Sequence, residues 1–285
     1  MRPSQERFIE RAAALIAPLL ACASLALAQG VPGAAGDPNQ EYPHQLVTVA
    51  RGGYSISALV THHANPQAFR HAIAMFPGHP GILKLREADG QFRFELRGNF
   101  LVRSRRHWLD EDILVVLIDA PSDEWSGFSQ RFRETARYGA DIEALLSDLS
   151  ARYKISDWTF VGTSEGTISA FHAARMNPQR VTRLIQTASV FSSSRNGPGL
   201  SAVDLAALPA ATLWVHHEND PCPSTFYRDA RDFATRSGKP LLTMRGGGPE
   251  RGGACEPYTA HGFVGVERDA VRAMLSWTRT GSLPN

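Results

Sequence analysis

The sequence predicts an α/β fold in which a mostly parallel sheet carries helices on both faces and an antiparallel hairpin at its start. From Ala72 to the C-terminus, segments with strand character alternate with segments of helical period, the order typical of strand–helix–strand units. Ile113–Ile118 (ILVVLI) is continuously apolar and rich in β-branched residues, as in a parallel strand covered on both faces. Two β-type runs, His44–Ala50 and Tyr54–His62, flank Arg51-Gly52-Gly53, which is a hairpin signal.

Strands are predicted where a short apolar or alternating run ends at glycine, proline or a polar turn. Ala72–Phe76 stops at Pro77-Gly78, and Gln91–Leu96 alternates and fits either a strand or a loop. The later strands are predicted at Ile113–Ile118, Trp158–Val161, Val181–Thr187, Ala211–His216 and Leu241–Met244.

Helices are predicted where apolar residues recur every three or four positions. In Phe132–Tyr153 one face carries Ile142, Leu145, Leu146 and Leu149. The other helices are predicted at Phe100–Leu109, Ser164–Met176, Ser224–Arg236 and Val266–Thr278. The stretch between Thr187 and Ala211 is too short for a large lid domain.

Composition excludes several classes of protein. The chain has 285 residues, 43% of them apolar, which is ordinary globular composition and excludes disordered, collagen-like and coiled-coil proteins. It has 30 Lys+Arg against 28 Asp+Glu, a formal charge of +2. That balance gives no field favouring nucleic acid or an anionic membrane, so neither is expected as a partner.

Residues 1–28 have the features of an export signal. A basic start precedes the apolar run Ala12–Ala28, which as a helix would span about 25 Å, short of a bilayer core of about 30 Å. Ala26-Leu27-Ala28 gives the small-x-small pattern that predicts cleavage before Gln29. The mature protein is therefore expected to be periplasmic or secreted, without stable membrane insertion.

Two alternatives for the N-terminus stay open. Cys22 follows Leu19-Leu20-Ala21, which resembles a lipoprotein box and would allow a lipid anchor at Cys22; the other alternative is an uncleaved anchor. Residues 29–43 are rich in Gly, Pro, Ala and Asn and are predicted to be a flexible leader. Residues 44–285 are predicted to form a single domain, because no linker-like stretch divides them.

The strongest chemical signal lies in mid-chain, where Trp158–Gly166 reads WTFVGTSEG. The pattern G-x-S-x-G between a strand and a helix places Ser164 on a tight bend with its hydroxyl exposed above the sheet. Glycines flank it because a Cβ would clash where the backbones come close. The pattern predicts that Ser164 is a nucleophile; a plain structural turn is the alternative.

A serine hydroxyl needs a base to remove its proton, and the base needs a carboxylate to orient it. His261 is the only histidine beyond His217, and it lies in a loop between the last predicted strand and the last predicted helix. Asp220 follows a predicted strand in an Asn-Asp-Pro turn and is the predicted carboxylate, with Glu218 as its competitor. Capping of the next helix, the alternative role for Asp220, suits Ser224 better.

The ordered set Gly162-Thr163-Ser164-Glu165-Gly166, Asp220 and His261-Gly262-Phe263 resembles the α/β-hydrolase superfamily. The resemblance covers essentially the whole chain after residue 28, and the short stretch after the predicted strand Val181–Thr187 is similar to that of lid-poor serine hydrolases. It implies an acyl-enzyme mechanism with catalytic Ser164, Asp220 and His261 and no cofactor.

The resemblance also implies an oxyanion hole made of two backbone N–H groups. One belongs to Glu165, and the other comes from the FPGHPG loop after Ala72–Phe76. Because proline lacks an N–H, the second donor is Gly78, His79 or Gly81. We predict His79, which holds the position of the second glycine in similar enzymes.

Cys222 and Cys255 are the cysteines that would remain after signal removal. Export implies an oxidising compartment, where two such thiols tend to pair. The bridge would join the loops carrying Asp220 and His261; free buried thiols are the alternative.

No metal site is expected. The pairs His62-His63 and His216-His217 lie in predicted strands or at their ends, where neighbours point to opposite faces and cannot readily chelate one ion. The motifs H-E-x-x-H and C-x-x-C are absent from the sequence.

These features predict an exported serine hydrolase acting on a small-molecule ester or amide. A carboxylic ester is favoured, because few residues remain for peptide-recognition subsites. The alternatives are a peptidase, amidase or acyltransferase of the same fold, and a non-catalytic binding protein on this scaffold.

Overall fold

The computed structural model of the chain describes residues 42–66, 68–194, 196–209 and 211–283. The predictions for the signal at 1–28, for Cys22 and for the leader up to residue 41 lie outside these ranges. Within them, no helix is both long and apolar enough to cross a bilayer.

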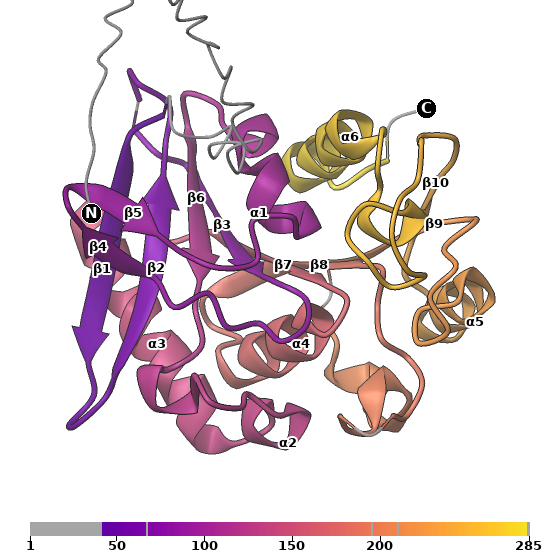
Figure 1. The fold of residues 1–285 in the computed structure, drawn as a ribbon, viewed down its shortest axis with the longest axis horizontal. Coiled ribbons are helices and arrows are strands. Elements are labelled where there is room, and N and C mark those ends of the chain that lie inside the picture. The colour runs from indigo at the N-terminus through magenta and orange to yellow at the C-terminus, as the bar shows by residue number, and fades with distance from the viewer. Residues whose placement is uncertain (1–41, 67, 195, 210, 284–285) are drawn as a thin grey trace, which may run out of the picture. The chain divides into compact units, whose positions relative to one another are not determined.

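An eight-stranded sheet forms the centre of the described chain (Figure 1). Its strands are β1 (His44–Ala50), β2 (Ser55–Thr61), β3 (His71–Phe76), β6 (Ile113–Ile118), β7 (Trp158–Thr163), β8 (Val181–Thr187), β9 (Ala211–His217) and β10 (Leu241–Met244). They lie in the order β1-β2-β6-β3-β7-β8-β9-β10. β2 pairs antiparallel with β1 and with β6, and the pairings from β6 to β10 are parallel. The predicted mostly parallel sheet with an antiparallel hairpin at its start is confirmed.

Helices cover both faces of this sheet, as predicted. They are α1 (Phe100–Ser104), α2 (Gln130–Arg133), α3 (Ala136–Tyr153), α4 (Gly166–Met176), α5 (Tyr227–Ser237) and α6 (Glu267–Thr280). Figure 1 shows α3, α4 and α5 on one side of the sheet and α1 and α6 on the other. Strand β6 is entirely buried because its alternate side chains enter two different cores: Leu114, Val116 and Ile118 pack in one, and Ile113, Val115 and Leu117 in the other.

Two predicted helices are interrupted. The helix predicted at Phe132–Tyr153 is in fact two, because Thr135 ends the first turn and caps α3, its hydroxyl accepting from Tyr138 N. The predicted helix Phe100–Leu109 continues after α1 as a 3₁₀ helix, η1 (Arg105–Trp108). Helical period predicted these segments, but it did not locate the breaks.

The helix predicted from Ser224 begins later, at Tyr227. Phe226 is its N-cap, and no side chain caps it, so the expectation that Ser224 caps this helix is wrong. The residues before the helix instead form a turn in which Thr225 N donates to Cys222 O.

Short elements occupy the remaining connections. Strands β4 (Arg86–Ala88) and β5 (Gln91–Arg93) form a separate antiparallel pair, which settles the first half of Gln91–Leu96 as strand. Between β8 and β9 the described residues contain only the 3₁₀ helices η3 (Gly199–Ala202) and η4 (Leu205–Ala207), in agreement with the expected absence of a large lid domain there.

The parallel strands place the functional loops together. Because β3, β7, β9 and β10 run in one direction, the loops at their C-terminal ends leave from the same edge of the sheet. Open α/β sheets bind their ligands at this edge.

Candidate active site

Ser164 lies in the turn between β7 and α4. Its φ is +51°, a left-handed conformation that a residue with a side chain seldom adopts. A Cβ on Gly162 would lie 2.6 Å from Gly166 O, and a Cβ on Gly166 would lie 1.9 Å from Phe76 O. Only glycine fits at both flanking positions, so the backbone forms the sharp strand-to-helix bend that the motif predicts.

His261 and Asp220 are brought together from two different loops. His261 lies in the 3₁₀ helix η5 (Ala260–Gly262), and its Nδ1 is 3.1 Å from Asp220 Oδ2. Both side chains are buried. Since a carboxylate only accepts, the proton on His261 is at Nδ1, and Nε2 is left free as an acceptor.

The competing carboxylate, Glu218, does not reach the imidazole. Its Oε2 accepts from Arg245 Nε at 2.9 Å, in an exposed ion pair. The structure therefore places Asp220 against His261, and Asp220 does not cap α5.

Thr225 is a third member of this buried group that the sequence did not reveal. Its hydroxyl donates to Asp220 Oδ2 at 2.8 Å and lies 3.1 Å from His261 Nδ1. The other carboxylate oxygen, Oδ1, accepts from Cys222 N at 2.9 Å. Asp220 is thus held by two donors besides the imidazole, which fix the direction of its carboxylate.

The predicted disulfide between Cys222 and Cys255 is present. Cys222 lies two residues after Asp220, and Cys255 lies six residues before His261. The bridge therefore links the two loops covalently close to the side chains that they bring together.

A second histidine lies beneath this pair. His216 on β9 is fully buried, and burial lowers its pKa to about 4. Its Nε2 accepts from Ser189 N at 2.8 Å. His216 is therefore neutral at ordinary pH and leaves the charge of Asp220 to His261.

The loop after β3 passes close to Ser164. A Cβ on Gly78 would lie 3.0 Å from Ser164 Cβ, so a larger residue would crowd the serine there. Gly78 and His79 line the cavity above Ser164, whereas Gly81 packs against Arg133 and Phe128 instead. Of the three candidate donors on this loop, Gly78 and His79 are the two that line the cavity.

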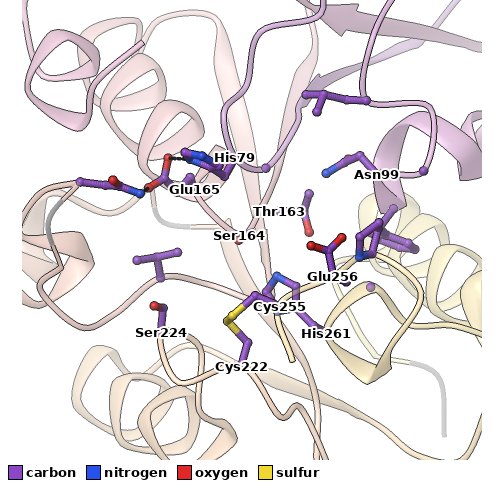
Figure 2. A pocket seen from close by; sticks show the side chains of 18 of the residues that line it. His79, Asn99, Thr163, Ser164, Glu165, Cys222, Ser224, Cys255, Glu256 and His261 are labelled. Carbon is purple, nitrogen blue, oxygen red and sulfur yellow. Dashed lines mark hydrogen bonds and ion pairs between the residues drawn. A yellow bond between two sulfur atoms is a disulfide. The ribbon is translucent and has the colours of Figure 1, made fainter. Parts of the chain in front are cut away.

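The N–H groups of His79 and Glu165 are available. Within the described residues, neither donates a hydrogen bond to another protein group. The two residues also contact each other through their side chains, with His79 Nδ1 lying 3.2 Å from Glu165 Oε2. The predicted donors therefore belong to two loops joined by a side-chain contact, visible as a dashed line in Figure 2.

Arg133 holds the same two loops from below. Its side chain is fully buried and donates to Pro80 O at 2.9 Å, Glu165 O at 3.3 Å and Ser169 Oγ at 2.6 Å. Its charge is balanced by the Glu165 carboxylate, 3.8 Å away. That carboxylate also accepts from Asn196 Nδ2 at 2.6 Å.

Ser164 and His261 line the same cavity, which has a volume of about 580 Å³. Figure 2 shows both side chains facing it. In the described structure they share no hydrogen bond; such contacts are often long before substrate binds and shorten in the substrate complex. The remaining walls are formed by Leu96, Gly98, Asn99, Phe100, Thr163, Val190, Ser194, Asn196, Ser224, Glu256, Pro257 and Gly262.

Sequence reasoning missed several of the residues that shape this site. Arg133, Thr225, Asn99 and Glu256 carry no motif, and each enters the site from a different loop or helix end. The only available signal was proximity in sequence, since Thr225 lies close to Asp220 and Glu256 close to His261.

No group of three or more His, Cys, Asp or Glu residues in the described part of the chain is arranged to hold a metal ion. The site consists of a hydroxyl, an imidazole, a carboxylate and backbone donors. This set is suited to nucleophilic attack on a carbonyl carbon.

No protein-family model and no curated protein sequence matches the chain. Solved structures do. A lid-less α/β serine hydrolase from Xanthomonas campestris is 15% identical, with 85% of this chain and 96% of that one covered and a TM-score of 0.52. Est1E from Butyrivibrio proteoclasticus is 14% identical, with 82% and 99% covered and a TM-score of 0.55.

A third match is a hydrolase described as CIB-like from Thermoplasma acidophilum, at 14% identity, 84% and 99% coverage and a TM-score of 0.53. These matches extend over most of both chains. The chain has the α/β-hydrolase fold.

Proposed function

We propose that this protein is a serine hydrolase that cleaves carboxylic esters through an acyl-enzyme. Ser164 Oγ attacks the ester carbonyl carbon while His261 Nε2 takes the hydroxyl proton. Asp220 stabilises the imidazolium that forms. The carbon–oxygen bond to the alcohol then breaks, and the imidazolium gives its proton to the departing oxygen. Water, deprotonated by His261, attacks the acyl-enzyme and releases the acid and free Ser164.

The oxyanion of each tetrahedral intermediate would accept from the N–H groups of His79 and Glu165. Donors that already point at the site need no rearrangement during reaction, and one such donor is typically worth about 10²–10³ in turnover. The side-chain contact between His79 and Glu165 and the buried Arg133 support this role by holding the two loops together.

One observation carries the proposal. Ser164 occupies a left-handed bend at the end of β7 and shares a cavity with an imidazole whose other nitrogen contacts a buried carboxylate. A purely structural turn does not need this combination of strain, exposure to a cavity and a buried histidine–carboxylate pair.

The size of the cavity favours an ester substrate over a peptide substrate. A volume of about 580 Å³ is in the range of small-molecule sites. Est1E has been solved with ferulic acid bound, so a related fold holds a small carboxylic acid.

The experiment compares hydrolysis of p-nitrophenyl acetate by the wild type, Ser164→Ala and His261→Ala. We expect both variants to lose at least about 10³-fold in kcat, as when a triad member is removed elsewhere. Ser201→Ala, an exposed serine on η3, is the matched control and should retain full activity. Equal activity of Ser164→Ala and the wild type would overturn the proposal, and preference for p-nitroanilides would favour the amidase alternative.

We also propose that the protein is exported, which the disulfide supports because such bonds persist in oxidising compartments. N-terminal sequencing of the protein from the periplasm or medium tests this. A chain beginning at Gln29 is expected. An acylated Cys22 would show that the protein is lipid-anchored and is not cleaved before Gln29. An intact N-terminus in the cytoplasm would contradict export.

A further inference from the structure

The cavity above Ser164 contains two carboxylates, and only one of them has a protein partner. Glu165 accepts from Asn196 and contacts His79 and Arg133. Glu256 also lines the cavity, but within the described residues its carboxylate takes part in no hydrogen bond or ion pair. Glu256 is an exposed residue, so its carboxylate reaches both the cavity and the solvent, and no described protein group pairs with its charge.

The backbone of Glu256 is held firmly. Its N–H donates to Gly253 O at 2.8 Å, and its carbonyl oxygen accepts from Thr259 Oγ1 at 3.0 Å. The preceding residue, Cys255, is bridged to Cys222. Figure 2 shows the Glu256 carboxylate directed into the cavity, near Asn99 and His261 in this view. The carboxylate is thus presented from a fixed point of the cavity wall.

The other lining groups do not supply a counter-charge. The two histidines are already engaged, His79 by Glu165 and His261 by Asp220. The rest of the wall is apolar, such as Leu96 and Val190, or neutral and polar, such as the serines, asparagines and glycines that complete it. The cavity that Ser164 lines therefore offers a bound molecule one unpaired negative charge.

We propose that this cavity selects esters that carry a positively charged group, an ammonium or guanidinium, which Glu256 binds. The inference rests on the proposed esterase function for the reaction itself. A carboxylate that a substrate cation can neutralise strengthens binding, since opposite charges attract each other more strongly at a cavity wall than in bulk water. The cation can lie in the acyl part or in the alcohol part, and the test separates the two.

The test uses pairs of esters that differ in charge and hardly in shape. The acyl pair is p-nitrophenyl 4-(trimethylammonio)butanoate and p-nitrophenyl 5,5-dimethylhexanoate. The alcohol pair is choline butyrate and 3,3-dimethylbutyl butyrate. We expect kcat/KM in the wild type to favour the cationic member of at least one pair by about tenfold, the size expected of the attraction between two unit charges a few ångströms apart at a partly solvated site, and the preference to fall at high salt.

Glu256→Gln keeps the shape of the side chain and removes its charge. It should lower the cationic-to-neutral ratio of kcat/KM by about tenfold. Glu87→Gln removes the same charge from the exposed strand β4, outside the cavity, and should leave the ratio unchanged. A wild-type preference for the neutral esters, or a ratio unaffected by Glu256→Gln, would overturn the inference.

A binding measurement separates this inference from the proposed function. Phenyltrimethylammonium is titrated into Ser164→Ala and into Ser164→Ala/Glu256→Gln, followed by NMR, where no turnover is needed. Weaker binding to the second variant supports the Glu256 subsite even if no ester is hydrolysed. Equal binding to both would count against the subsite even if Ser164 proves to be the nucleophile.

Discussion

The two sides of the candidate site are stabilised by different kinds of interaction. On the nucleophile side, the loops carrying His79 and Glu165 are tied to one fully buried cation, Arg133. On the acid–base side, Asp220 is held by a hydroxyl and a backbone N–H, and the Cys222–Cys255 bridge joins its loop to that of His261.

The difference follows from where the residues come from. The nucleophile side is built at the ends of two adjacent strands, β3 and β7, where a side chain below the sheet edge can reach both loops. The acid–base side lies on longer loops after β9 and β10, which are also adjacent strands, and the disulfide joins these loops beyond the ends of the strands. We therefore expect loss of the buried charge to destabilise the nucleophile side. On the acid–base side, we expect loss of the cross-link to lower stability and loss of the orienting carboxylate to lower activity.

The largest expected effect is on the acid–base side. In Asp220→Asn, an amide replaces an oxygen that accepts from His261 Nδ1, and the imidazole adopts the wrong tautomer. We expect kcat on p-nitrophenyl acetate to fall by about 10⁴-fold. Thr225→Val removes only the hydroxyl donor to Asp220 and should cost about tenfold. An Asp220→Asn enzyme within tenfold of the wild type would contradict the assigned orientation.

The nucleophile side is tested with Arg133→Met. This change leaves Glu165 without its buried cation and frees four carbonyl or hydroxyl acceptors. We expect the free energy of unfolding, measured in urea, to fall by about 3–5 kcal/mol. Arg152→Met breaks an exposed pair with Asp148 and should change it by less than about 1 kcal/mol. Similar losses of unfolding free energy in Arg133→Met and Arg152→Met would contradict a special structural role for the buried Arg133.

The covalent link is tested with Cys222→Ser/Cys255→Ser. The bridge spans 33 residues in sequence, for which the chain-entropy account gives about 3–4 kcal/mol of stability as an upper value. Urea unfolding of the double variant, compared with the reduced and the oxidised wild type, measures it. The reduced wild type should match the double variant. No difference between the oxidised wild type and the double variant would show that strand and loop contacts alone hold the acid–base side.

The acid–base side should also respond to acid through His216. Its pKa is lowered from 6.5 to about 4 in the folded protein, so between these values the unfolded chain binds the extra proton first. Stability then falls as pH drops from 6.5 toward 4, by about 3 kcal/mol from this group. His216→Gln keeps an acceptor for Ser189 N and removes the titration.

The wild type must be compared with His216→Gln because Asp119 opposes the loss of stability that His216 causes as pH falls. Burial raises the pKa of Asp119 to about 6, so that its own contribution decreases stability as pH rises from 3.8 to 6. Urea unfolding at pH 7, 5.5 and 4.5 should show a smaller loss on acidification in His216→Gln than in the wild type. Parallel curves for the two proteins would contradict a neutral buried His216.

Much of the fold was predictable because short stretches of sequence, such as apolar runs and turn residues, determine its elements. The continuous apolar run Ile113–Ile118 became the doubly covered strand β6, and the hairpin around Arg51-Gly52-Gly53 formed as expected. The break at Thr135 was not predicted, because helical period continues through Phe132–Tyr153 and a threonine cap is visible only when its hydroxyl meets Tyr138 N.

The site was predictable where a motif constrains the backbone or where the order of residues along the chain narrows the candidates. Ser164 is flanked by two glycines, and a larger residue would clash with the backbone at either position. His261 and Asp220 followed from chain order, and the structure brings them together. Arg133 and Glu256 could not be predicted from the sequence, because they lie in parts of the chain that share no motif. The fold alone places Glu256 in the cavity wall and Arg133 against the loop that carries Glu165.

The proposed reaction depends most directly on Ser164 being the nucleophile. Treatment of the wild type with a fluorophosphonate, followed by peptide mapping by mass spectrometry, should place a single adduct on the peptide containing Ser164. The adduct should be absent from Ser164→Ala and much slower to form in His261→Ala. Labelling of Ser164→Ala at the wild-type rate, or an adduct on a different residue of the wild type, would contradict the account.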